Sequence, residues 1–265
     1  MTSPRSIRRG ESSELGPFGG VGSPGLVSGC GAKAGLANTR SGWLARLTEV
    51  STVYDCSEPS NRAAGLAAAA GAVRSGRLVV LPTDTVYGIG CDAFDAEAVR
   101  SLLDAKGRGP DMPVPVLVGS WTTIDGLVLS VPRQARALIE AFWPGGLSIV
   151  LPHAPSLAWD LGQTRGTVML RMPLHPVALE LLRDVGPMAV SSANRTGHAP
   201  AASAQEARDQ LGDAVPVYLD GGLSGENIAS TIVDLTGPDA LILREGAVSK
   251  KEVDEVLGIE VEVAR

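Results

Sequence analysis

Basic side chains stand at the ends of several apolar segments of this 265-residue chain. Arg171 closes the run TVMLR and Arg244 closes LILR, while Lys106 and Arg108 precede the run VPVLV. Such cations bind carboxylates and phosphates, because a guanidinium offers paired N–H donors and an ammonium offers a compact charge. Together with nearby hydroxyl and amide groups they predict a site for an anionic ligand, such as a nucleoside triphosphate or a carboxylate. The polar side chains that border apolar runs in the same way are Thr83, Tyr87, Thr167, Ser192, Asn194 and Ser230.

Each of these residues also has a purely structural interpretation. Lys106 and Arg108 follow a predicted helix, whose dipole favours a cation at that end. Thr83 lies next to Pro82, as is typical of a turn. Arg171 ends an apolar strand, where a salt bridge to an aspartate would satisfy its charge. The prediction of a ligand site therefore depends on the joint occurrence of these residues.

The elements that would position these residues alternate between helices and strands from about residue 53, which predicts an α/β domain. Helices are predicted over 60–75 and 96–106, after Pro132 and Pro176, and after S-x-x-E capping boxes at Ser203 and Ser249. Strands are predicted at 77–81, 114–118, 147–151, 167–171, 187–191, 215–219, 230–235 and 240–244. Short and long connections alternate, so we expect a mixed sheet with its ligand beyond the strand ends.

Residues 1–52 are rich in Gly, Ser and Arg and lack apolar periodicity, which predicts a disordered extension. A basic arm for nucleic acid is the alternative for this segment. It holds six basic and three acidic side chains, and the whole chain has a net charge of −6, so the remainder carries −9. A body that acidic is a poor general binder of nucleic acid. We place the catalytic domain at 53–258 and a tail at 259–265.

Several familiar kinds of site are missing from the sequence. There is no P-loop motif, no complete GxGxxG after a strand and no GxSxG. The three histidines and three cysteines are scattered, which argues against a zinc site and a disulfide framework and suits a cytoplasmic protein. No apolar run approaches the roughly 20 residues of a membrane helix. A metal would come as Mg²⁺ with the nucleotide.

Seven motifs in a fixed order resemble the YrdC-like family of threonylcarbamoyl-AMP synthases, in its short single-domain form. They are PTDTVYGIG (82–90), KGRGPDMPVPVLV (106–118), FWPGGLSIVL (142–151), TVMLRMPLHP (167–176), AVSSANRTG (189–197), STIVD (230–234) and LREG (243–246). The resemblance implies a twisted mixed sheet flanked by helices, with a large concave, positively charged cavity. It also implies the synthesis of threonylcarbamoyl-AMP and pyrophosphate from L-threonine, bicarbonate or CO₂, and ATP. A separate tRNA threonylcarbamoyl transferase complex would then modify adenosine 37, with tRNA bound by this chain at most weakly.

Residue roles follow from the same motifs as implications of the resemblance. The threonine-binding residues would be Thr83, Tyr87, Arg171 and Ser230. The ATP-binding residues would be Lys106, Thr167, Ser192, Asn194 and Arg244. Lys106 and Arg108 would neutralise charge in catalysis, with Mg²⁺ carried by ATP. Val190 and Pro200 would touch the ligand through their backbones. The loop 107–113 would order over the site and exclude water, since a carbamate is labile in water.

The chain departs from the family pattern at a few positions. Met112 replaces a usual lysine and Ala229 a frequent acidic residue, while Gly146 and Ser148, where Pro and Thr are commoner, are interpreted as packing variation. Two other functions remain open. A carbamoyl-transfer module of the hydrogenase-maturation type shares this domain but normally accompanies zinc-finger segments. A non-catalytic module that binds double-stranded RNA or tRNA is disfavoured by the acidic body and the few aromatic residues.

Overall fold

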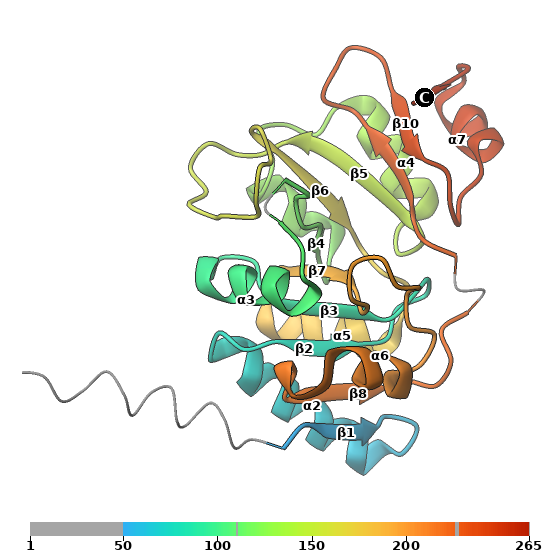
Figure 1. Cartoon of the computed structure of the whole chain (residues 1–265). Helices are drawn as coiled ribbons and strands as arrows, with labels where there is room; N and C mark the ends of the chain where they lie inside the picture. The colour runs from blue at the N-terminus through green and yellow to red at the C-terminus, as the bar shows by residue number, and fades with distance from the viewer. Residues whose placement is uncertain (1–49, 110, 226–227, 265) are drawn as a thin grey trace, which may run out of the picture. The chain divides into compact units, whose positions relative to one another are not determined.

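Strands from both ends of the chain pair into one long mixed sheet that twists along its length (Figure 1). The computed structural model describes residues 50–109, 111–225 and 228–264. Within these residues the sheet has eleven strands in the order β1-β8-β2-β3-β7-β4-β6-β5-β9-β10-β11. They are β1 (Thr52–Asp55), β2 (Val79–Leu81), β3 (Gly88–Asp92), β4 (Val116–Leu117), β5 (Leu147–Pro152), β6 (Thr167–Arg171), β7 (Met188–Ser192), β8 (Val217–Asp220), β9 (Thr231–Asp234), β10 (Leu241–Arg244) and β11 (Glu262–Val263). Parallel and antiparallel pairs alternate irregularly, so the predicted mixed sheet is confirmed.

The helices begin and end close to the predicted signals. The α-helices are α2 (Pro59–Arg74), α3 (Ala96–Lys106), α4 (Arg133–Phe142), α5 (Pro176–Val185), α6 (Ala204–Leu211) and α7 (Lys250–Leu257), with 3₁₀ turns η2 (Trp121–Gly126) and η3 (Gly212–Ala214). Ser249 and Glu252 form the predicted reciprocal capping box of α7. At α6 the box is incomplete, because the carboxylate of Glu206 accepts from the backbone of Ala202 instead of the N-cap Ser203. None of the helices in the described ranges combines the length and apolar character of a membrane span.

Two buried clusters cover the two faces of the sheet. Neighbouring residues on a strand belong to different clusters: Val80 packs in one, while Val79 and Leu81 pack in the other. The first cluster includes α3, α4, α6 and α7, and the second includes α2 and α5. In Figure 1, α2 and α5 lie together behind the β1–β7 part of the sheet, while α3 lies in front of it. The face under α2 and α5 is thus helix-covered only over part of its length.

Strand β3 was not predicted, because the motif GIGCD has little β-propensity and two glycines. It lies in the middle of the sheet, antiparallel to both β2 and β7. A Cβ on Gly88 would come within 2.6 Å of Val190 Cγ1, and one on Gly90 within 2.8 Å of Val190 Cγ2. The glycines therefore allow β3 to approach the branched side chain of Val190 across the ladder.

Residues beyond both predicted boundaries of the catalytic domain take part in the sheet. The disorder expected for the N-terminal extension concerns 1–49, which lie outside the described residues. Thr52, placed in that extension, pairs with Val217 as the first residue of β1. Within the predicted tail, β11 pairs in parallel with β10. The predicted strand 114–118 is shorter in the structure, because Pro113 and Pro115 have no N–H groups to donate to a ladder.

Candidate active site

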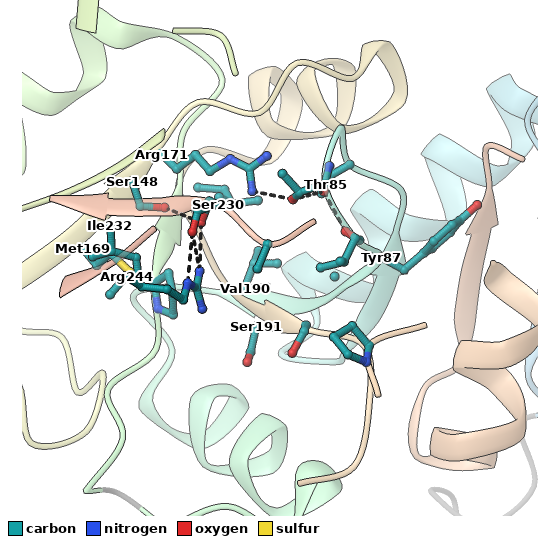
Figure 2. Close-up of a pocket in the computed structure, with 18 of the residues that line it drawn as sticks. Thr85, Tyr87, Ser148, Met169, Arg171, Val190, Ser191, Ser230, Ile232 and Arg244 are labelled. Carbon is teal, nitrogen blue, oxygen red and sulfur yellow. Dashed lines mark hydrogen bonds between the residues drawn. The ribbon is translucent and has the colours of Figure 1, made fainter. Parts of the chain in front are cut away.

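A cavity of about 350 Å³ opens on the sheet face that α2 and α5 leave partly uncovered. Alternate residues of neighbouring strands form its floor, since side chains at i and i+2 share one face. Met169 and Arg171 come from β6, Val190 from β7 and Ser148 from β5. Figure 2 shows these side chains turned toward one space, with Thr85 from the segment after β2 across from Ser230 and Arg244. The cavity therefore gathers residues from within strands as well as from strand ends, where the sequence predicted the ligand site.

Arg171 is held in one orientation by three hydrogen bonds. Its Nε donates to the carbonyl oxygen of Gly145 (2.9 Å), its Nη1 to Thr85 Oγ1 (2.8 Å) and its Nη2 to Asp84 Oδ1 (2.7 Å). Asp84 Oδ1 also accepts from the backbone N–H of Leu174, which fixes the carboxylate. Burial lowers the pKa of Arg171, and the charge of Asp84 opposes that shift. A rigid guanidinium of this kind suits a carboxylate ligand, because its remaining donors are fixed in direction.

The hydroxyl groups after β2 are largely satisfied within the protein. Thr83 Oγ1 donates to the carbonyl oxygen of Val86 (2.6 Å) and accepts from the backbone N–H and the hydroxyl of Thr85 (3.2 and 3.1 Å), so its hydrogen-bonding capacity is used within the protein. Tyr87 is fully buried, and its hydroxyl bonds to Asp220 Oδ1 (3.2 Å) and the carbonyl oxygen of Gly222. Tyr87 is among the lining residues, but Figure 2 shows its ring and hydroxyl turned away from the other labelled side chains, toward the β8 end. The polar group of Tyr87 is thus used within the protein.

A β-bulge brings Arg244 to the cavity side of the sheet. Ile242 pairs with Val233, and the register then shifts so that Arg244 pairs with Ile232, which lines the cavity. Plain alternation along β10 would place Arg244 on the opposite face, with Ile242. Its Nε and Nη2 donate to the carbonyl oxygen of Ser230 at 3.0 and 2.7 Å. Burial lowers the pKa of Arg244.

A third arginine faces the cavity from the loop after α3. Arg108 Nη1 donates to Ser191 Oγ (3.1 Å), and its buried Nε has no partner among the described residues. Burial lowers its pKa. The same cavity has an apolar lining: Met112, Pro113, Pro115, Met169 and Ile232. A cavity that combines cations with apolar side chains suits a ligand that joins phosphates to a heteroaromatic ring.

Lys106 and Asn194 lie behind the cavity wall. Lys106 Nζ donates to the backbone carbonyls of Ser192 and Asn194, the latter at 2.7 Å. The amide of Asn194 donates to the carbonyl of His198 (2.8 Å). Burial, followed by repulsion from Arg108, lowers the pKa of Lys106 to about 8. These two residues brace the loop after β7 and do not line the cavity, whereas Ser192 does.

Thr167 is also outside the cavity lining. It begins β6 on the same strand face as Met169 and Arg171, and its Oγ1 donates to the carbonyl of Thr164 (2.7 Å). The ten predicted site residues are therefore divided in this structure. Thr83, Tyr87, Arg108, Arg171, Ser192, Ser230 and Arg244 line the cavity, whereas Lys106, Thr167 and Asn194 do not.

Five lining residues with polar or flexible side chains were not predicted as site residues: Thr85, Met112, Ser148, Met169 and Ser191. Ser148 was interpreted as packing variation, which is wrong, because its hydroxyl hydrogen-bonds to Ser230 Oγ (2.9 Å) in the cavity wall. The alternation of side chains between the two faces of each strand could have identified some of these residues. Met169 lies two residues before Arg171, so both share a face.

The sequence and fold were compared with known proteins. The family model of Sua5/YciO/YrdC domains, described as "Telomere recombination", matches residues 71–246. The chain belongs to the Sua5/YciO/YrdC family. A putative threonylcarbamoyl-AMP synthase of Mycobacterium tuberculosis (strain H37Rv) is 64% identical over 207 residues, which cover 78% of this chain and 95% of the relative. The threonylcarbamoyl-AMP synthase of Bacillus subtilis is 35% identical, over 73% of this chain and 56% of the relative. The predicted family is thus confirmed.

Solved structures of the Sua5/YciO/YrdC family share this fold. Pyrococcus abyssi Sua5 complexed with L-threonine superposes with a TM-score of 0.75 at 32% identity, covering 81% of this chain and 63% of that chain. Escherichia coli YciO has a TM-score of 0.68 at 25% identity, covering 77% of this chain and 99% of that chain. This chain therefore spans less than two thirds of the archaeal protein but nearly all of the bacterial one. The predicted fold class is confirmed by these structures.

Proposed function

We propose that this chain is an L-threonylcarbamoyladenylate synthase that acts by ATP-dependent adenylyl transfer. L-Threonine and bicarbonate or CO₂ would form a carbamate, one oxygen of which attacks the α-phosphorus of ATP. The bond from that phosphorus to the bridging oxygen breaks, and pyrophosphate leaves. Relatives from bacteria and from Pyrococcus bear the name threonylcarbamoyl-AMP synthase, and an archaeal relative has been solved with L-threonine.

The observation that carries this proposal is the charge character of the cavity. Three arginines line it, Arg108, Arg171 and Arg244, and no Asp, Glu or His is among its described lining residues. A carbamate and a triphosphate repel each other, so bringing them together requires cations and exact alignment more than a nucleophilic side chain. The cavity is therefore suited to two anionic reactants.

Each arginine has a place in this reaction. Arg171, rigidly held beside Thr83 and Thr85, binds the threonine carboxylate. Arg244 and Arg108 line the same cavity, where they would neutralise the phosphates. The apolar wall at Met112, Met169 and Ile232 suits the adenine ring. Lys106 and Asn194 act on the site through the end of β7, which carries Ser192, and the loop that follows it.

A magnesium ion fits this site only as a companion of ATP. The described residues contain no cluster of three or more His, Cys, Asp or Glu side chains, and the cavity wall offers hydroxyl groups of Ser and Thr. Mg²⁺ keeps several waters and is commonly bound through substrate phosphates. When bound with ATP, it would supply further neutralisation of the phosphate charge.

The product implies a partner of a defined kind. A mixed anhydride of a carbamate and AMP is an activated acyl donor, so an acyltransferase that accepts it must act next. We propose that this is the tRNA threonylcarbamoyl transferase complex, with tRNA itself bound weakly or indirectly. We also propose a cytoplasmic location, consistent with Cys56 and Cys91, which are free thiols.

The proposal is tested by incubating the chain with ATP, Mg²⁺, L-threonine and bicarbonate and analysing the products by mass spectrometry. We expect threonylcarbamoyl-AMP and pyrophosphate, both dependent on all the reactants. Arg171→Ala should lose the product while retaining the fold, whereas Arg74→Ala, at an exposed ion pair with Asp184, should behave like wild type. ATP hydrolysed without a threonine adduct would contradict the proposal.

A further inference from the structure

Two serine hydroxyls form a connected pair in the cavity wall. Ser148 Oγ and Ser230 Oγ are 2.9 Å apart, and Arg244 Nη2 donates to Ser230 Oγ at 3.2 Å (Figure 2). Both serines line the cavity and both are more than nine-tenths buried. Neither hydroxyl has another partner within the described part of the chain. The pair is therefore the end of a chain of hydrogen bonds that begins at a cation.

Counting protons shows what this pair can offer a ligand. An arginine can only donate, so Ser230 Oγ accepts from Arg244. The two hydroxyls hold two protons, and one of them is used in the bond between the serines. One O–H donor remains for a ligand. A hydroxyl that accepts from a cation becomes a stronger donor, which favours the direction from Arg244 through Ser230 to Ser148.

The position of Ser148 on the sheet identifies what that donor faces. The β5–β6 ladder pairs Ile149 with Leu170, which places Ser148 opposite Arg171 on the cavity face. On its other side, Ser148 pairs with Ile232 of β9, the residue that also pairs with Arg244. Directly opposed residues have Cβ atoms about 4.5–5.5 Å apart. Ser148 therefore lies between the two arginines.

We propose that Ser148 binds the carbamate group of the substrate by donating a hydrogen bond to one of its oxygens. This inference rests on the proposed function. The threonine carboxylate lies at Arg171 and the phosphates at Arg244, and the carbamate is the group that connects them. A donor located between the two arginines meets that group and leaves its other oxygen for attack on phosphorus. Ser230 retains a lone pair, with which it accepts a hydrogen bond from threonine.

The test separates the carbamate from threonine itself. In Ser148→Ala we expect kcat for product formation to fall roughly ten- to hundredfold, the loss typical of a hydrogen bond to a charged group. Binding of L-threonine measured by calorimetry without bicarbonate or ATP should stay within about twofold of wild type. Ser148→Thr keeps the hydroxyl and should retain kcat within a few-fold. Ser224→Ala, which removes a buried serine hydroxyl outside the cavity lining, is the matched control for folding.

Each other outcome overturns the inference in an identifiable way. An unchanged kcat in Ser148→Ala shows that no contact is made in the reaction. An equal loss in Ser148→Thr shows that the effect is steric. Loss of threonine binding without bicarbonate places the contact on the amino acid, and loss of kcat in Ser230→Ala alone makes Ser230 the donor. A wild-type chain that forms no product overturns the proposed function as well, whereas normal wild-type activity confines the failure to this inference.

Discussion

The ammonium group of Lys106 lies against two backbone carbonyl groups at the end of β7, although the sequence motif predicted a phosphate contact for it. The backbone oxygen of Lys106 accepts from the N–H of Thr196 as well, so the residue holds the loop after β7 at two points. The direction of a long side chain is decided by its neighbours in the fold. The orientation of the Lys106 side chain could therefore not be predicted from the sequence alone.

The lowered pKa of Lys106 has a consequence for stability. In the folded chain the pKa is about 8, and in the unfolded chain it returns to about 10.5. Between these pH values the unfolded state binds more protons, so this group makes the free energy of unfolding rise with pH, by up to about 3 kcal/mol. We expect urea unfolding of wild type to show this rise from pH 8 to 10.5 relative to Lys106→Met. The exposed Lys251→Met should retain the wild-type slope. If the free energy of unfolding changed with pH equally in wild type and Lys106→Met, a group other than Lys106 would cause the rise.

At the scale of elements, the glycines of β3 allow this strand to pack closely against β7 in the middle of the sheet. A Cβ on Gly90 would meet Val190 Cγ2 at 2.8 Å and the carbonyl oxygen of Ala189 at 3.1 Å. Since that carbonyl belongs to the neighbouring strand, it cannot move aside without disturbing the ladder. We expect Gly90→Ala to lower the free energy of unfolding by about 1–3 kcal/mol in chemical denaturation.

Gly71 provides the opposite case for the same substitution. It is exposed on α2, and a Cβ there would have no neighbour within 4 Å. Gly71→Ala should therefore stabilise the chain by about 0.5–1 kcal/mol, because alanine loses less conformational freedom in a helix. If Gly90→Ala were as stable as wild type, the close approach of β3 to β7 would not require glycine at residue 90.

The sequence predicted the elements whose residues carry their own signals. Asp95, Pro176 and Gly186 mark helix boundaries by local chemistry, and these boundaries agree with the structure. By contrast, β3 is held by its partners on both sides, and the bulge in β10 is visible only in the register against β9. Of the seven predicted site residues that share the cavity, six lie at or next to strand ends, and Arg108 lies in the loop after α3. Ser148 was missed because one small side chain within an apolar strand gives no signal of a cavity.

At the scale of the whole molecule, the cavity joins separate parts of the sheet. Its walls come from the segments after β2 and α3, and its floor comes from the part of the sheet that runs from β7 to β10 in the order β7-β4-β6-β5-β9-β10. A ligand therefore links segments far apart in the chain. At about 100 times its Kd, ATP or L-threonine should add roughly 2.7 kcal/mol of stability. For a domain of this size, we expect Tm to rise by about 5–10 °C in a thermal-shift assay.

The control for this prediction is Arg171→Ala. That variant should respond to ATP but not to L-threonine, since only the proposed carboxylate partner is removed. Equal shifts by threonine in both proteins would place the amino acid elsewhere on the molecule.

Helices cover only part of one face of the sheet, and the substrates would fill the space that the helices leave open. Where α2 and α5 end, the strands still present Met169, Val190 and Ile232, which are apolar enough to form the inside of a protein. Bound nucleotide and amino acid would occupy the space that a further helix fills in an ordinary three-layer sandwich. Larger side chains could fill this cavity and give a more stable protein that binds no substrate. The open cavity therefore lowers the stability of the chain but is required for activity.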